Sequence, residues 1–175
     1  MKNMKTSFFL PRYAVLSCMA LILIFALSCS DTRPREAVKK TTDAAAPDFS
    51  LKTLSGKTFK LSGQTGKPVL LIFVTTWCPS CRSEIPHYKD IYETYGRRGL
   101  EVAMIDIQEP GATVSRFASR NQIPFGILLD EQGAVAGAYG IVGVPAMVLI
   151  DKDGKILSQD YMAIDMLLET TLGKK

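Results

Sequence analysis

Residues 69–86 read VLLIFVTTWCPSCRSEIP, and the remainder of the chain is best understood from this segment outward. The first six residues, Val69 to Val74, are all apolar and rich in β-branched side chains, which predicts a strand buried on both faces of a sheet. Cys78 and Cys81 follow, separated by two residues, and the sequence from Cys78 to about Tyr95 predicts a helix that ends at Gly96. The cysteine pair therefore stands where a buried strand passes into the first turn of a helix.

This position of the cysteine pair predicts redox chemistry. The N-terminus of a helix carries unpaired N–H groups and partial positive charge, so a thiolate is stabilised there. A spacer of two residues also brings the second sulfur within reach of the first, so that the two can close a disulfide. A purely structural disulfide is the alternative interpretation of the same pair.

Composition indicates one globular domain of ordinary size, since the 175 residues are 47% hydrophobic and 22% charged. The net charge is +4, but Lys2, Lys5 and Arg12 lie in an N-terminal leader without acids, so the charge does not indicate a nucleic-acid partner. The Cys78–Cys81 pair and the single histidine, His87, cannot supply a four-ligand zinc site. We expect no metal.

The leader, residues 1–28, has the pattern of an export signal, with positive charges followed by an apolar run. Ala26-Leu27-Ser28-Cys29 resembles a bacterial lipobox, which predicts a lipidated Cys29 and removal of residues 1–28. An uncleaved N-terminal anchor helix is the alternative. Both interpretations place the protein outside the cytoplasm, anchored to a bacterial membrane. Residues 29–46 are then a linker and residues 47–175 the folded domain.

Strands and helices are predicted to alternate along the folded domain. It starts with a hairpin around Ser55-Gly56-Lys57. Beyond the central strand and its helix, strands are expected at 100–107, 125–129, 146–150 and 156–159, and helices at 112–120, 132–139 and 162–172. This order predicts an α/β fold with a central mixed sheet flanked by helices.

The motif Trp77-Cys78-Pro79-Ser80-Cys81 resembles the active-site motif of the thioredoxin superfamily. Gly143-Val144-Pro145 precedes a predicted strand, as the cis-proline of that family does. Residues 46–51 and the acid Glu84, three residues beyond the second cysteine, are similar to the extracytoplasmic TlpA/ResA-like branch. Members of that branch are membrane-tethered thiol–disulfide oxidoreductases, and many reduce haem-binding cysteines during cytochrome c maturation. The resemblance covers residues 46–172 and implies a thioredoxin fold with an N-terminal β-hairpin extension.

Two departures from that branch stand out. Ala146 replaces the threonine that usually follows the cis-proline, which puts the grip on substrate in doubt. The usual glycine after the last strand is absent, because the chain has Gln159-Asp160-Tyr161 there. This second departure puts the end of the sheet in doubt.

The resemblance implies a role for each residue of the site. Cys78, exposed at the start of the helix, would attack the substrate, and Cys81 would resolve the mixed disulfide. Glu84 lies on the same helix face as Cys81 and would exchange protons with it, unless it is an ordinary solvated glutamate. The substrate-binding residues would be Trp77, Val144 and Pro145. Val144 would pair with a bound peptide through its backbone, whereas Trp77 could instead be part of the core.

Electrons would pass through the cysteines themselves, so we expect no cofactor. The implied partners are protein disulfides, apocytochrome c among them, and a membrane thiol reductase as electron donor. A peroxiredoxin-like thiol peroxidase is one alternative, since Thr75 matches the threonine three residues before the attacking cysteine of that family. Leu71, however, stands where that family has proline. A non-catalytic thioredoxin-fold binding module is the other alternative, and the intact cysteine pair argues against it.

Overall fold

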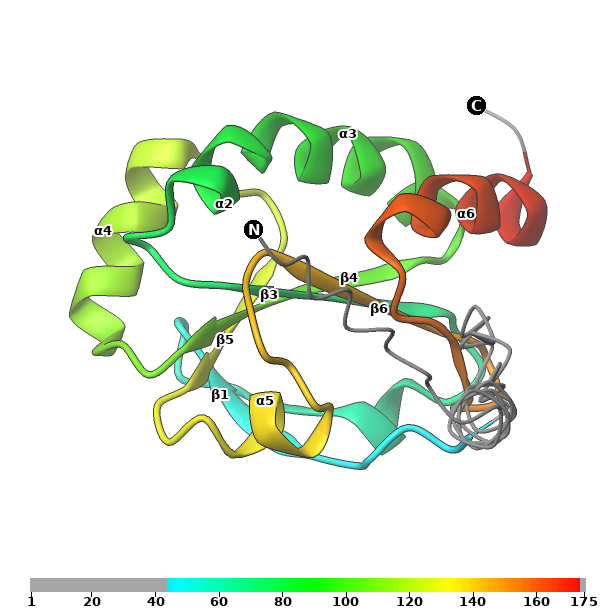
Figure 1. Cartoon of the computed structure of the whole chain (residues 1–175), viewed down its shortest axis with the longest axis horizontal. Helices are drawn as coiled ribbons and strands as arrows, with labels where there is room; N and C mark the ends of the chain where they lie inside the picture. The colour runs from blue at the N-terminus through cyan, green and yellow to red at the C-terminus, as the bar shows by residue number, and fades with distance from the viewer. Residues whose placement is uncertain (1–43, 174–175) are drawn as a thin grey trace, which may run out of the picture. The chain divides into compact units, whose positions relative to one another are not determined.

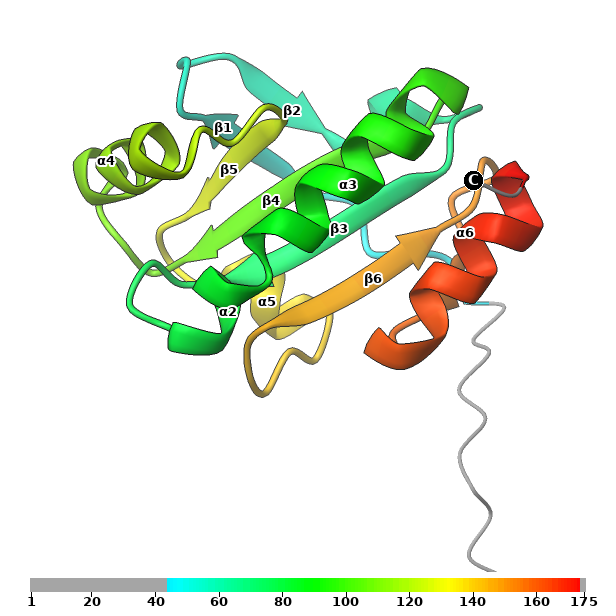
Figure 2. The ribbon, with the colours of Figure 1, turned by 90° about the horizontal axis from the view of Figure 1, so that it is seen from above.

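The computed structural model describes residues 44–173. Within this range the chain forms a seven-stranded sheet in the order β2-β1-β5-β4-β3-β6-β7 (Figures 1 and 2). The strands are β1 (Ser50–Thr53), β2 (Thr58–Lys60), β3 (Val69–Val74), β4 (Glu101–Ile107), β5 (Gly126–Asp130), β6 (Ala146–Ile150) and β7 (Ile156–Ser158). The helices are η1 (Leu61–Gln64), α2 (Pro79–Ser83), α3 (Ile85–Tyr95), η2 (Gly96–Arg98), α4 (Gly111–Asn121), α5 (Ala134–Ala138), η3 (Tyr161–Ala163) and α6 (Ile164–Leu172).

The sheet is mixed, as the sequence predicts. Strand β3 pairs in parallel with β4 and antiparallel with β6, and β4 pairs in parallel with β5. The β1–β2 hairpin turns at Gly56, whose φ of 79° is readily adopted by glycine. The hairpin joins the sheet through an antiparallel pairing of β1 with β5. The predicted α/β fold with its N-terminal hairpin extension is confirmed.

Strand β3 forms the centre of two cores, one on each face of the sheet. Each of its six residues is at most 2% exposed. Leu70 and Ile72 belong to the core that contains residues of α3, α4 and α6, whereas Leu71 and Phe73 belong to the core that contains residues of α5. Figure 1 shows these helices on opposite sides of the sheet. The prediction of a strand buried on both faces is therefore confirmed, and this rigid strand carries the cysteine segment at its end.

The helix that follows the cysteine pair is not continuous. Instead of one helix from Cys78 to Tyr95, α2 ends at Ser83 and α3 begins at Ile85, with Glu84 between them at φ −86° and ψ −7°. Pro86 is the cause, because proline lacks an N–H and its ring clashes with the carbonyl four residues earlier. In the first turn of a new helix the same residue is tolerated. Glu84 therefore lies at a junction between two helices.

The predicted end of this helix is confirmed, since α3 ends at Tyr95 and Gly96 is its C-cap residue. Gly96 has a helical φ of −57°, and the chain continues through η2 to Gly99, which has a left-handed φ of 95°. The doubt about the end of the sheet is settled as well: β7 pairs with β6, with a register shift at Leu149/Ile150, and the chain then enters η3. The absence of a glycine at 159–161 thus does not remove the last strand.

The leader, Cys29 and the linker up to residue 43 lie outside the described residues. The predicted signal peptide and lipidated cysteine therefore stay predictions. Among residues 44–173, none of the helices combines the length and the apolar character needed to cross a bilayer.

Candidate redox site

Cys78 is the N-cap residue of α2, with φ −70° and ψ 116°. Its Sγ accepts a hydrogen bond from the backbone N–H of Cys81 at 3.1 Å. Pro79 follows at the first helical position, where an N–H is not required. Both cysteines are free thiols in this structure. A sulfur that already accepts an N–H bond at a helix start is well placed to carry negative charge.

The two cysteines are more enclosed than the sequence indicates. Cys78 is 5% exposed and Cys81 0%, so the expectation of an exposed attacking cysteine is wrong for the reduced protein. Burial, together with the hydrogen bond to Cys78, raises the pKa of Cys81 to about 12. Cys81 therefore holds its proton at neutral pH, and the two sulfurs are chemically different.

The proline loop lies directly against the first sulfur. The Val144–Pro145 peptide bond is cis, and the Val144 carbonyl oxygen is 3.8 Å from the Sγ of Cys78. Sheet topology explains this contact between distant segments: β6 runs antiparallel to β3, so the residues before Ala146 lie beside the end of β3, where Phe73 pairs with Ala146. The structure thus brings Cys78, Cys81 and the Val144–Pro145 segment together.

Trp77 lies on the surface, with 67% of the residue exposed. The alternative in which it is part of the core is therefore excluded. Its backbone carbonyl accepts a hydrogen bond from Nη2 of Arg82 at 3.2 Å. Val142, three residues before Pro145, is likewise fully exposed. Apolar side chains are thus open to solvent on both segments that contribute to the site.

Glu84 is connected to a pair of tyrosines that the sequence analysis did not identify. The hydroxyl of Tyr161 donates to Oε2 of Glu84 at 2.8 Å, and the hydroxyl oxygens of Tyr161 and Tyr88 are 3.5 Å apart. Burial is the main cause that raises the pKa of Tyr161 to about 12. Burial also raises the pKa of Tyr88, as do its hydrogen bond with Tyr161 and the charges of Cys81 and Glu84. These groups therefore form one partly buried polar cluster next to Cys81.

Two acidic residues near the end of β3, Glu109 and Asp106, were also not predicted from the sequence as part of the site. Glu109 accepts hydrogen bonds from the backbone N–H and the hydroxyl of Thr76, at 2.5 and 2.6 Å. Asp106 is 1% exposed, and neither of its carboxylate oxygens has a hydrogen-bond partner among the described residues. Burial and the charge of nearby Glu109 raise the pKa of Asp106 to about 8. Since β4 lies parallel to β3, with Asp106 opposite Val74, this acidic pair lies at the end of the sheet that carries the cysteines.

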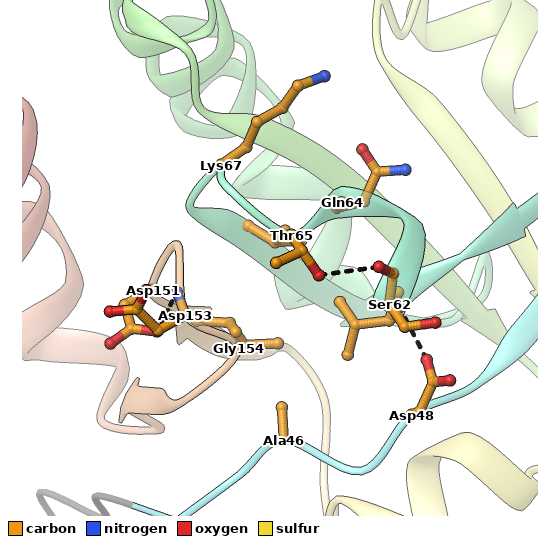
Figure 3. Close-up of a pocket in the computed structure, with 12 residues that line it drawn as sticks. Ala46, Asp48, Ser62, Gln64, Thr65, Lys67, Asp151, Asp153 and Gly154 are labelled. Carbon is orange, nitrogen blue, oxygen red and sulfur yellow. Dashed lines mark hydrogen bonds between the residues drawn. The ribbon is translucent and has the colours of Figure 1, made fainter.

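A separate pocket lies at the other end of the sheet (Figure 3). It is lined by Val69, at the start of β3, and Ile150, at the end of β6. Asp151 accepts hydrogen bonds from the N–H groups of Asp153 and Lys155, and Asp48 accepts one from Ser62. The Asp151 carboxylate stabilises the turn between β6 and β7, and the pocket lies at the opposite end of β3 from the cysteines.

The fold and the paired cysteines define a thioredoxin-fold protein. Comparison with known proteins narrows this class: residues 42–159 match the model of the AhpC/TSA family, and the chain belongs to that family. Similar chains include the thiol-disulfide oxidoreductases ResA of Geobacillus thermodenitrificans and of Halalkalibacterium halodurans, which are 39% and 38% identical over 113 and 112 residues. These matches span 65% and 64% of this chain and the same shares of the relatives. The chain therefore covers slightly less than two thirds of each relative.

Solved structures of thiol–disulfide exchange proteins are also similar to this chain. A thiol:disulfide interchange protein described as DsbE, from Chlorobium tepidum, superposes with a TM-score of 0.70 at 29% identity, over 75% of this chain and 98% of that one. StoA from Bacillus subtilis superposes with a TM-score of 0.62 at 26% identity, over 73% of this chain and 98% of that one. The resemblance to the TlpA/ResA-like branch of the thioredoxin superfamily is confirmed.

Proposed function

We propose that the protein is a thiol–disulfide oxidoreductase that reduces disulfide bonds in other proteins. One observation carries the proposal: Sγ of Cys78 accepts an N–H bond at the start of α2, while Cys81 is buried behind it and keeps its proton. An attacking sulfur and a reserve thiol are what a two-step exchange requires. The similarity to ResA proteins, at 39% identity for one of them, supports the same activity.

In the first step the thiolate of Cys78 attacks one sulfur of the substrate disulfide. The substrate S–S bond breaks, its other sulfur leaves as a thiol after taking a proton, and a mixed disulfide forms on Cys78. In the second step Cys81 loses its proton and attacks Cys78, so that the second substrate thiol is released. The substrate gains two electrons and two protons, and Cys78 and Cys81 become a disulfide.

Glu84 is our candidate acceptor for the proton of Cys81. A thiol with a pKa of about 12 attacks slowly unless a base takes its proton. Glu84 lies one helical turn beyond Cys81, and its carboxylate is oriented by the Tyr161 hydroxyl at 2.8 Å. A Glu84→Gln variant should therefore form the mixed disulfide at a near-normal rate and release product slowly, in stopped-flow measurements between pH 5 and 9. Equal resolution rates in the variant and the wild type would exclude this role.

On the substrate side, Val144 presents backbone next to Cys78, and Trp77 presents an exposed ring beside it. An extended peptide could add as a strand along the Val144 segment and bring its own disulfide to the sulfur. The absence of a threonine at Ala146 is expected to weaken this interaction relative to other members of the branch.

For the cellular setting we propose an extracytoplasmic protein with a signal peptide at 1–28, a lipidated Cys29, a linker at 29–46 and a domain at 47–175. A membrane thiol reductase would return electrons to the cysteine pair, and apocytochrome c is the proposed substrate. Mass spectrometry of the protein extracted from membranes tests the anchor. An intact Met1 would favour the anchor helix instead.

The deciding experiment is the equilibrium reduction potential of the Cys78–Cys81 couple, combined with substrate trapping by a Cys81→Ser variant. A potential near or below thioredoxin's ~−270 mV supports a reductant, and one near ~−120 mV would indicate an oxidant. The trapped mixed disulfide identifies the substrate. A Cys78→Ser/Cys81→Ser protein that still acted on substrate at the wild-type rate would favour a binding module without thiol chemistry.

The chain belongs to the AhpC/TSA family. A thiol peroxidase is therefore the alternative function that should be tested together with disulfide reduction. Thr75 lies three residues before Cys78, and its hydroxyl is buried with no hydrogen-bond partner within residues 44–173. Leu71, however, is fully buried core on β3, where the peroxidase motif has a proline. Peroxide consumption faster than peptide disulfide reduction would decide for the peroxidase.

A further inference from the structure

A groove beside the redox site is lined by three arginines, Arg82, Arg116 and Arg120. Thr76, two residues before Cys78, lines the same groove. The groove therefore runs up to the segment that carries the attacking cysteine. We refer to it as the arginine groove.

Two helices build the arginine groove. Helix α4 contributes Thr113, Arg116, Phe117, Arg120 and Asn121, whose spacing of three and four residues places them on one helix face. Phe117 is buried in the core below α4 and so fixes this face in position, while both arginines are exposed. Helix α2 contributes Arg82, which directly follows Cys81 and is tied to the Trp77 carbonyl at 3.2 Å.

The three guanidinium groups have no carboxylate partner among the described residues. Arg116 donates to the hydroxyl of Thr113 at 3.3 Å, and Arg82 donates to a backbone carbonyl. The acid that contacts the groove lining, Glu109, uses both carboxylate oxygens to accept from Thr76. Like charges four residues apart on a helix, such as Arg116 and Arg120, repel each other. The cluster therefore does not stabilise the fold through ion pairs, and its charge is available to a ligand.

We propose that the arginine groove binds an acidic segment of the substrate protein and holds its disulfide against Cys78. This inference rests on the proposed reduction of protein disulfides and adds a specificity to it. Guanidinium groups bind carboxylates through paired hydrogen bonds, and a cleft of one sign of charge concentrates ligands of the other. A concave groove next to the cysteines fits a segment of polypeptide better than it fits a flat anionic membrane.

The test compares two disulfide-bonded peptides of equal length that differ only near the cysteines. One has Asp and Glu there, and the other has Asn and Gln. We expect wild-type kcat/KM to be about 10-fold higher for the acidic peptide at low salt, with the preference falling as salt is added. An Arg116→Ser/Arg120→Ser protein should lose this preference, and an Arg120→Glu protein should favour the neutral peptide.

The matched control is Arg97→Ser/Lys57→Ser, which removes two exposed positive charges outside the groove and should keep the preference. Hydroxyethyl disulfide, which is small and neutral, should be reduced at the same rate by the wild type, the two groove variants and the control variant. Equal rates for the two peptides in the wild type, with hydroxyethyl disulfide still reduced, would overturn the groove proposal alone. If the wild type reduced none of the three disulfides, the two peptides and hydroxyethyl disulfide, the proposed function would be overturned.

Vesicles of anionic lipid test the other possible ligand of the arginine groove, a negatively charged membrane. If the double arginine variant lost binding to phosphatidylglycerol vesicles while its peptide preference was unchanged, the groove would be a membrane contact and the substrate proposal would be wrong. Unchanged vesicle binding together with a lost peptide preference supports the proposal.

Discussion

Cys78 and Cys81 are separated by two residues, yet their surroundings assign them different chemistry. Cys78 Sγ accepts the N–H of Cys81, whereas burial raises the pKa of Cys81 to about 12. We therefore expect Cys78 to be alkylated by iodoacetamide faster than Cys81 in the reduced protein at pH 7, as read by peptide mass spectrometry. The Cys81→Ser and Cys78→Ser variants serve as reciprocal controls. Faster labelling of Cys81 would reverse the assigned roles.

Tyr161 provides a second prediction at the residue scale. Its hydroxyl donates to Glu84 at 2.8 Å, and a hydrogen bond to a charged group contributes about 1.5–3 kcal/mol. Tyr161→Phe should slow product release by roughly 3- to 10-fold, since only part of that energy bears on the reaction, and should leave the first attack unchanged. Stopped-flow traces across pH 5–9 should also show an altered pH profile. Tyr92→Phe, on the same helix as Tyr88, is the control, and an equal effect of both changes would make the role structural.

These residues also mark how far the sequence predicts the site. Cys78 and Cys81 are recognisable because their spacing and the strand before them are local features. Tyr161 contacts Glu84 from 77 positions away, and Glu109 contacts Thr76 from 33 positions away. Neither contact leaves a local pattern, although the missing glycine at 159–161 did mark the segment as unusual. The exposure of Cys78 was mispredicted, because it depends on the Val144 loop, which only the folded sheet brings close.

At the scale of elements, the Glu109 carboxylate helps to hold the loop between β3 and α2, together with the hydrogen bond from Arg82 to the Trp77 carbonyl. Glu109 accepts both the N–H and the hydroxyl of Thr76, and it thereby fixes the loop two residues before Cys78. Glu109→Ala should lower the free energy of unfolding by about 1–3 kcal/mol, since two hydrogen bonds to a charged group are lost. The rate of mixed-disulfide formation should fall as well.

Chemical denaturation and single-turnover kinetics measure these two effects. Glu131→Ala, an exposed residue after β5, is the control and should change neither. A Glu109→Ala protein that was less stable but formed the mixed disulfide at the wild-type rate would limit Glu109 to a structural role.

Element types were predictable where periodicity or long apolar runs decide them, as for β3 and α4. The ends of the helices and strands were less predictable. The break at Glu84 follows from Pro86, but the sequence predicted one helix from Cys78 to about Tyr95 that includes this proline, because a proline in the first turn of a helix and one inside a helix have the same local sequence. The end of α3 was predicted correctly, because Gly96 is its C-cap residue, whereas the short η2 segment that leads on to Gly99 was not predicted.

At the scale of the whole molecule, Asp106 makes stability depend on pH. Its pKa is raised to about 8 in the folded state, whereas an unfolded aspartate has a pKa of about 3.9. Between these values the folded state binds one proton more than the unfolded state. Stability therefore falls as pH rises from about 4 to about 8, by up to ~1.4 kcal/mol per pH unit, and levels off above that range.

Asp106→Asn removes this titration, so its free energy of unfolding should exceed that of the wild type by an amount that grows from pH 5 to pH 8. Urea unfolding at several pH values measures the difference. The exposed Asp153→Asn is the control and should run parallel to the wild type. Parallel curves for Asp106→Asn as well would mean that the buried carboxyl does not titrate in this range.

The enclosure of Cys78 bears on how long the reduced protein would last in the extracytoplasmic setting proposed above. A residue that is 5% exposed is poorly accessible to dissolved oxidants, whereas the polypeptide substrate proposed above would bring its own disulfide to the sulfur along the Val144 segment. Under the proposed function, this enclosure insulates the two electrons of the reduced cysteine pair from small oxidants and lets them pass to the disulfide of a bound polypeptide. Such insulation lets the reduced protein survive the interval between one encounter and the next.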